Sequence, residues 1–115
     1  MKKPSKYNNR KVELGGFTFD SQKEARRYSE LKLLVRVGQI SDLELQKSFV
    51  LAESVKFNNE PRAKRAVCYI ADFAYVENGL MVVEDVKSKA TKSLPVYRLK
   101  KHLMMSVHGI EIQEI

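Results

Sequence analysis

The chain has 115 residues, which is enough for one domain with a modest core and too few for two. Lysine and arginine number 21 against 14 acidic residues, and the resulting net charge of +7 favours a polyanionic partner, nucleic acid before membrane. A lone cysteine, Cys68, excludes an internal disulfide framework and any Cys-x-x-Cys zinc pattern. Without a signal-peptide segment or a membrane span, we expect a cytoplasmic protein, with Cys68 in its core.

The N-terminal half is predicted to contain a basic arm, a small hairpin, a helix and a strand. Residues 1–9 are polar and basic and are predicted to be flexible. Residues 11–19 are typical of two short strands joined by a glycine turn. Residues 20–37 predict a helix that ends at Gly38. Apolar residues alternate over 43–51, which predicts a strand.

The C-terminal part is predicted to add a loop over 88–93, a helix from Ser93 to about His108, and a last short strand over 110–115. Four apolar residues at helical spacing predict the buried stripe of that helix: Val96, Leu99, Leu103 and Val107. The order of elements predicts one mixed α/β domain over residues 1–115.

The strongest local signal is Asn78-Gly79, which separates two β-rich runs and predicts a tight hairpin. If these two residues form the loop, the register sets Asp72 directly opposite Asp85 on one face. Tyr69 and Phe73 then fall on the other face. Both faces are mostly apolar, so the hairpin is predicted to lie in the centre of a covered sheet.

The opposed carboxylates of Asp72 and Asp85 need a reason, because like charges opposed on an apolar surface are destabilising. A divalent cation would supply one. Lys87, two residues after Asp85, lies on the same face and completes a recognisable chemistry. The alternative is that both aspartates lie near a strand end in solvent, with Lys87 in a simple ion pair.

Glu24 is a candidate third carboxylate. It begins a stripe with Tyr28, Leu31 and Val35, so we expect it on the buried side of the first predicted helix. It also lies three residues after Ser21, which is the spacing of a capping box. Metal binding and capping are both open for this residue and do not exclude each other.

Asp72, an interval of twelve residues, and then Asp85-Val86-Lys87, with an acidic residue on an upstream helix, resembles the PD-(D/E)XK nuclease superfamily. The wider chain is similar to small phage endonucleases of that superfamily, a group that includes Holliday-junction resolvases. Ala71 stands where the motif has proline, a position without a chemical role. The matching stretches are spread over most of the chain: residues 9–12, 19–25, 40–46, 69–73 and 83–87.

The resemblance implies a restriction-endonuclease-like fold, in which a mixed β-sheet with a central hairpin is flanked by helices. It implies Mg²⁺, with Mn²⁺ as a substitute, because Mg²⁺ held by carboxylates promotes phosphodiester hydrolysis. Asp72, Asp85, the Val86 carbonyl and Glu24 would be the ligands, and Lys87 would orient the attacking water and stabilise the phosphorane charge. No small-molecule cofactor is expected.

Further residues are weaker candidates. The resemblance suggests Gln46 near the site, although an ordinary strand-surface role is favoured for it. Tyr97 could contact the site or simply pack. Basic residues on either side of the predicted hairpin are spaced for phosphate contacts, or are solvated individually. They are Lys89, Lys92, Arg98, Lys100, Lys101, Arg62, Lys64 and Arg65.

The sequence therefore predicts a metal-dependent DNA endonuclease, acting on branched or structured DNA as a homodimer, encoded by a phage or its bacterial host. A chain this small has little room for a sequence-reading element, so DNA shape is the expected cue. One alternative is a non-catalytic nucleic-acid-binding protein with a nuclease-like fold. Another is a small basic adaptor that binds a protein.

Overall fold

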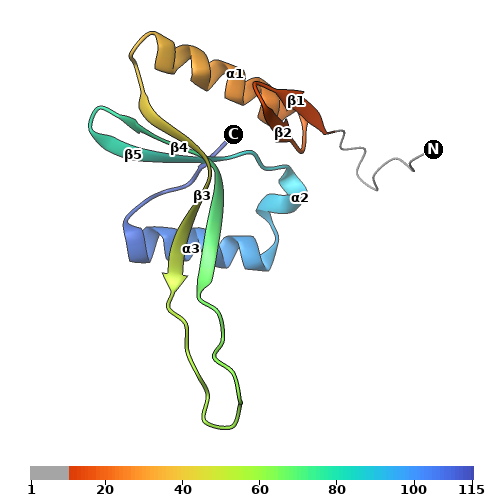
Figure 1. Cartoon of the computed structure of the whole chain (residues 1–115), viewed down its shortest axis with the longest axis vertical. Coiled ribbons are helices and arrows are strands. Elements are labelled where there is room, and N and C mark those ends of the chain that lie inside the picture. The colour runs from red at the N-terminus through yellow and green to blue at the C-terminus, as the bar shows by residue number, and fades with distance from the viewer. Residues whose placement is uncertain (1–10) are drawn as a thin grey trace, which may run out of the picture. The chain divides into compact units, whose positions relative to one another are not determined.

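The computed structural model describes residues 11–115, and the chain groups into two compact units (Figure 1). The first runs to Ser41 and the second from Asp42 to Ile115. The predicted basic arm over 1–9 lies outside the described residues, and the single nuclease domain over 1–115 stays a prediction. No helix within the described part of the chain is long and apolar enough to span a membrane.

The first unit contains the predicted hairpin and helix. β1 (Val12–Leu14) pairs antiparallel with β2 (Phe17–Phe19). α1 (Gln22–Arg36) begins after Ser21, whose side chain accepts a hydrogen bond from the Glu24 backbone amide. The helix ends before Gly38, which has a φ of +79° and so adopts the left-handed conformation that glycine tolerates.

The second unit is built on a four-stranded sheet in the order β3-β4-β5-β6, and the fold is mixed α/β as predicted. The strands are β3 (Ser41–Ala52), β4 (Val67–Glu77), β5 (Leu80–Asp85) and β6 (Gln113–Glu114). β4 and β5 are antiparallel, whereas β6 is parallel to β5, so the sheet is mixed. β3 and β4 are joined by a long extended connection that projects beyond the sheet (Figure 1).

The β4–β5 hairpin has the predicted register. Glu77 pairs with Leu80, and the ladder continues to Phe73 opposite Glu84. Asn78 and Gly79 both have positive φ, at +53° and +78°, as a tight two-residue hairpin loop requires. This local geometry places the end of β5 beside the middle of β4.

Side-chain alternation along β4 changes phase near Asp72, which the sequence did not predict. Tyr69 and Ala71 share a core with Ala74 and Val83, although strict alternation would set them on opposite faces. Such a change is the signature of one extra residue in the strand, as in a β-bulge. The prediction that Tyr69 faces away from Asp85 is therefore wrong. Consistent with the shift, Ile70 is exposed, and Cys68 is only half-buried rather than in the core.

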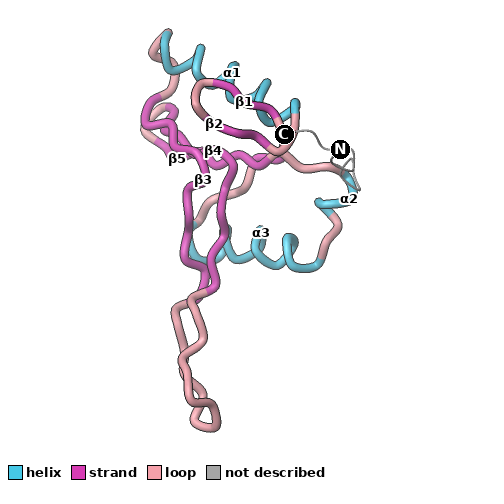
Figure 2. Tube along the Cα trace, turned by 45° about the vertical axis from the view of Figure 1, so that its right-hand side comes forward, coloured by secondary structure: helices cyan, strands magenta, loops and turns pink. Residues whose placement is uncertain are grey.

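Two helices follow β5 and correct the predicted boundaries. α2 (Lys89–Lys92) occupies the segment predicted as a loop. α3 (Pro95–His108) is preceded by Leu94 as N-cap rather than by Ser93, and Leu94 makes no side-chain capping bond. α3 crosses the β3–β4 hairpin in both Figure 1 and Figure 2.

The buried face of α3 also differs from the predicted stripe. Tyr97 and Met104 pack in the core, and Leu103 of the predicted stripe is partly buried against it. The other three members, Val96, Leu99 and Val107, are exposed. Tyr97 has polar partners at its hydroxyl and a cation over its ring. Burying this residue turns the helix away from the face that the aliphatic residues alone would select.

Met104 is fully buried in this core, while its neighbour Met105 is 57% exposed. We therefore expect Met104→Ala to lower the free energy of unfolding by about 2–5 kcal/mol through lost contacts and a residual cavity. Met105→Ala is the matched control and should change it by less than about 0.5 kcal/mol. Urea denaturation measures both. Equal effects of the two substitutions would contradict this packing of α3.

Candidate metal and nucleic-acid site at the end of β5

The centre of the site is the Asp85 carboxylate, which is 1% exposed at the last position of β5. The Tyr69 hydroxyl donates to Asp85 Oδ2 at 2.6 Å. The Lys87 ammonium lies 3.1 Å from the same oxygen. A buried carboxylate without such partners would be strongly destabilising, so these two contacts hold a charged group in an otherwise apolar region.

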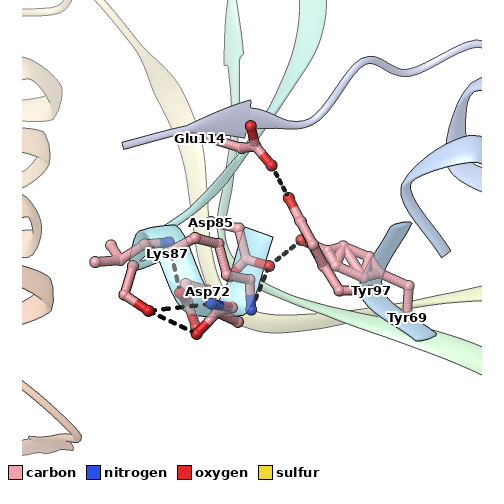
Figure 3. A network of polar contacts seen from close by, with 9 residues as sticks. Tyr69, Asp72, Asp85, Lys87, Tyr97 and Glu114 are labelled. Atoms are coloured by element: carbon pink, nitrogen blue, oxygen red, sulfur yellow. Dashed lines mark hydrogen bonds and ion pairs between the residues drawn. The ribbon is translucent and has the colours of Figure 1, made fainter. Parts of the chain in front are cut away.

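Asp72 comes to the same strand end by a different contact from the one predicted. The β4–β5 ladder stops at Phe73 and Glu84, one residue short of an Asp72–Asp85 pair. Asp72 Oδ2 instead accepts a hydrogen bond of 2.9 Å from the Val86 backbone amide. Figure 3 shows Asp72, Asp85 and Lys87 gathered at this end of the hairpin.

The electrostatics of the neighbouring tyrosines agree with that placement. Burial raises the pKa of the Tyr69 hydroxyl above its usual value, and its hydrogen bond to Asp85 adds to the effect. Burial and a hydrogen bond to Glu114 likewise raise the pKa of Tyr97, and the negative charges of Asp72 and Asp85 add to the effect at both hydroxyls. Both carboxylates therefore act on the same two hydroxyls.

Lys87 is held between Asp85 and the ring of Tyr97. Its Nζ lies 4.9 Å from the ring centroid, within the range of a cation–π contact. The Lys87–Asp85 ion pair, predicted as the alternative to a catalytic role, is thus present. Tyr97, for which packing and a place at the site were both open, does both.

Sequence reasoning missed two residues of this network, Tyr69 and Glu114. Tyr97 donates a hydrogen bond of 2.6 Å to Glu114 Oε2, and Lys101 lies 3.2 Å from Oε1. The bond from Tyr97, aided by Lys101, holds the pKa of Glu114 below its usual range. Glu114 lies opposite Asp85 in the parallel β5–β6 pair, a long-range pairing that no local sequence signal indicates.

Glu24 belongs to the first unit and is 7% exposed. Tyr28 and Leu31 of its predicted stripe are buried, whereas Val35 is exposed, because α1 is covered only over its first turns. The cap from Ser21 to the Glu24 amide is confirmed. A role for the Glu24 carboxylate as a metal ligand stays a prediction.

The remaining candidates lie within the second unit. Gln46 is exposed in β3 and has a φ of +55°, unusual for a residue other than glycine and typical of an irregular strand. Val86 is half-buried directly after Asp85. Within residues 42–115, no group of three or more His, Cys, Asp or Glu side chains is arranged to hold a metal ion. A cation here would therefore have two carboxylates from this unit.

The basic candidates fall on three elements of the second unit. Lys89 and Lys92 are exposed on α2. Arg98, Lys100 and Lys101 follow on α3, where Lys101 pairs with Glu114. The β3–β4 connection carries the other three candidates, which are exposed: Arg62, Lys64 and Arg65. The ammonium of Lys64 lies 3.3 Å from a carboxylate oxygen of Glu60.

Comparison with known proteins gives one assignment. The family described as "Protein of unknown function (DUF1064)" matches residues 4–112, nearly the whole chain. The chain belongs to this family. No curated protein and no solved structure matches it. The site of this DUF1064 protein must accordingly be interpreted from its own geometry.

The raised pKa of Tyr69 gives an expectation for alkaline stability. Unfolded tyrosine loses its proton near pH 10 while folded Tyr69 keeps it, so stability falls as the pH rises above 10, by up to about 1.4 kcal/mol per pH unit. Tyr69→Phe removes the share of that dependence that Tyr69 supplies and leaves the share of Tyr97, whose pKa is also raised. The substitution also costs about 1–3 kcal/mol at neutral pH through the lost bond to Asp85. Chemical denaturation from pH 8 to 11 measures both effects. An unchanged alkaline slope in the variant would contradict the assigned role of the hydroxyl.

Proposed function

We propose that this protein is a metal-dependent DNA endonuclease that hydrolyses phosphodiester bonds. The observation that supports this most directly is the convergence of Asp72, Asp85 and Lys87 on one end of the β4–β5 hairpin. Two carboxylates and a lysine at a strand end match the PD-(D/E)XK pattern in the sequence.

The donors present fit a hard divalent cation. Carboxylate oxygens suit Mg²⁺, which is commonly held by one or two carboxylates and keeps several waters. Asp72 and Asp85 would hold it, with the Val86 carbonyl as a further oxygen. When bound, the cation would lower the pKa of a water and neutralise phosphate charge.

The residues of the chain would divide the remaining work. Asp85 Oδ2 already accepts from Tyr69, so Tyr69 fixes the orientation in which Oδ1 is presented. Lys87 would orient the attacking water and stabilise the charge that develops as that oxygen bonds to phosphorus and the bond to the 3′ oxygen breaks. The basic residues of α2, α3 and the β3–β4 connection would hold neighbouring phosphates.

We further propose that the substrate is branched or otherwise structured DNA and that the protein acts as a homodimer in the cytoplasm. The exposed basic residues offer contacts to the DNA backbone, and two copies would give two symmetric cuts. Sedimentation equilibrium with DNA absent tests the dimer. A mass that stays at 13.3 kDa up to high concentration would contradict it.

Cleavage of plasmid and four-way-junction DNA with Mg²⁺, Mn²⁺ or EDTA tests the activity. Asp85→Asn should reduce cleavage at least about 100-fold, because a lost ligand removes several kcal/mol of charge stabilisation. DNA binding should be retained or tightened, because a negative charge near phosphate is removed. Fluorescence anisotropy measures the binding.

Asp42→Asn is the matched control, because it makes the same chemical change at an exposed position of β3. It should leave cleavage unchanged. Binding without cleavage by the native chain under every metal condition would contradict the nuclease proposal and favour a non-catalytic binding protein. Loss of binding in a folded Asp85→Asn variant would contradict the role given to Asp85.

A further inference from the structure

A cavity of about 510 Å³ lies beside the network of the candidate site, between α2, α3 and the C-terminal segment. Its volume is in the range of pockets that take small ligands. Charged and titratable side chains make up most of its lining. They are Lys92, Arg98, Lys101 and His102, with Glu111 and Glu114.

The charge of this cavity favours an anion. Lys92, Arg98 and Lys101 are cationic at neutral pH. Of the two carboxylates, Glu114 already accepts from Tyr97 and pairs with Lys101. With Lys101 paired to Glu114, the cations Lys92 and Arg98 face only the exposed Glu111, so the lining keeps a net positive charge. An arginine fork and two ammonium groups around one space suit the oxygens of a phosphate.

Tyr97 connects the cavity to the candidate catalytic residues. Its ring lies under Lys87, and its hydroxyl bonds to Glu114 in the cavity wall. Figure 3 shows Lys87 beside Asp85, and the Tyr97 hydroxyl bonded to Glu114. The lining of the cavity does not include Asp72, Asp85 or Lys87, so a ligand there would be distinct from the group held at Asp72 and Asp85.

We infer that this cavity is a phosphate-binding subsite, which takes a phosphate of the nucleic acid other than the one cleaved. The assignment to nucleic acid rests on the proposed function, whereas phosphate recognition does not. The phosphate could belong to the DNA backbone or to a strand terminus, since both present the same oxygens.

The test measures binding in EDTA, so that no cleavage takes part. Inorganic phosphate is titrated by NMR, and a 12-nucleotide single strand, with or without a 5′-phosphate, by anisotropy. Arg98→Gln with Lys101→Gln should weaken both ligands about 10-fold or more, and lower the salt dependence of strand binding by one to two phosphate contacts. Lys32→Gln with Arg36→Gln is the control, because it removes two exposed charges of α1 that lie outside the cavity and outside the residues proposed to hold phosphates.

Glu111→Gln provides a second variant that does not disturb the core, because Glu111 is exposed. It should tighten phosphate binding several-fold. If the strand with a 5′-phosphate binds more tightly than the strand without it, the subsite takes a strand terminus. If the two strands bind equally, the subsite takes a backbone phosphate. Equal losses in the two double variants, with no gain from Glu111→Gln, would overturn the subsite. That result would not contradict the proposed nuclease activity, which the cleavage test measures separately. Conversely, a lack of cleavage would not contradict phosphate binding in the cavity.

Discussion

The arrangement of the second unit depends on supplying polar partners to one buried carboxylate, that of Asp85. An isolated ionised carboxylate in an apolar interior is prohibitively costly, so its partners must be fixed. Tyr69 reaches it because β4 changes phase, and Lys87 because it follows on the same face after β5. The backbone of the last residue, Ile115, also donates to the Asp85 carbonyl, which binds the C-terminal strand to this point. Strand β4, the segment after β5 and the C-terminal residue therefore all contact Asp85.

The preceding residue makes a useful comparison. Glu84 is as buried as Asp85, faces the opposite side of β5, and is hydrogen-bonded by the hydroxyl of Tyr75. Each of the two consecutive acids is thus matched by a tyrosine from β4. Only Asp85, however, is accompanied by a lysine and lies at the strand end beside Asp72. A tyrosine partner explains how an acid is buried, while the lysine and the second carboxylate distinguish the candidate site.

What the sequence predicts well is local. Asn78-Gly79 determines the hairpin register, and Ser21 and Gly38 bound α1, because turn and cap geometry depend on a few adjacent residues. The phase of β4 and the rotation of α3 depend on contacts between distant segments, and neither follows from periodicity. The spacing of the aliphatic residues did not predict the buried face of α3, because Tyr97 determines it. Tyr97 packs in the core, contacts the Lys87 ammonium with its ring and donates a hydrogen bond to Glu114. Glu114 could not be found because its own strand, β6, is only two residues long and pairs with the distant β5.

The same contacts suggest how the proposed site would change when a cation enters. Lys87 now balances the Asp85 charge, a task that a divalent cation would take over. The lysine would then be released from the carboxylate and become available to phosphate oxygens. The Tyr97 ring limits how far the Lys87 side chain moves, because the Lys87 ammonium contacts the face of that ring. The ring is itself held in place by the hydrogen bond from the Tyr97 hydroxyl to Glu114. On the proposed function, the ion pair of the metal-free protein keeps the catalytic lysine close to the place where it would act.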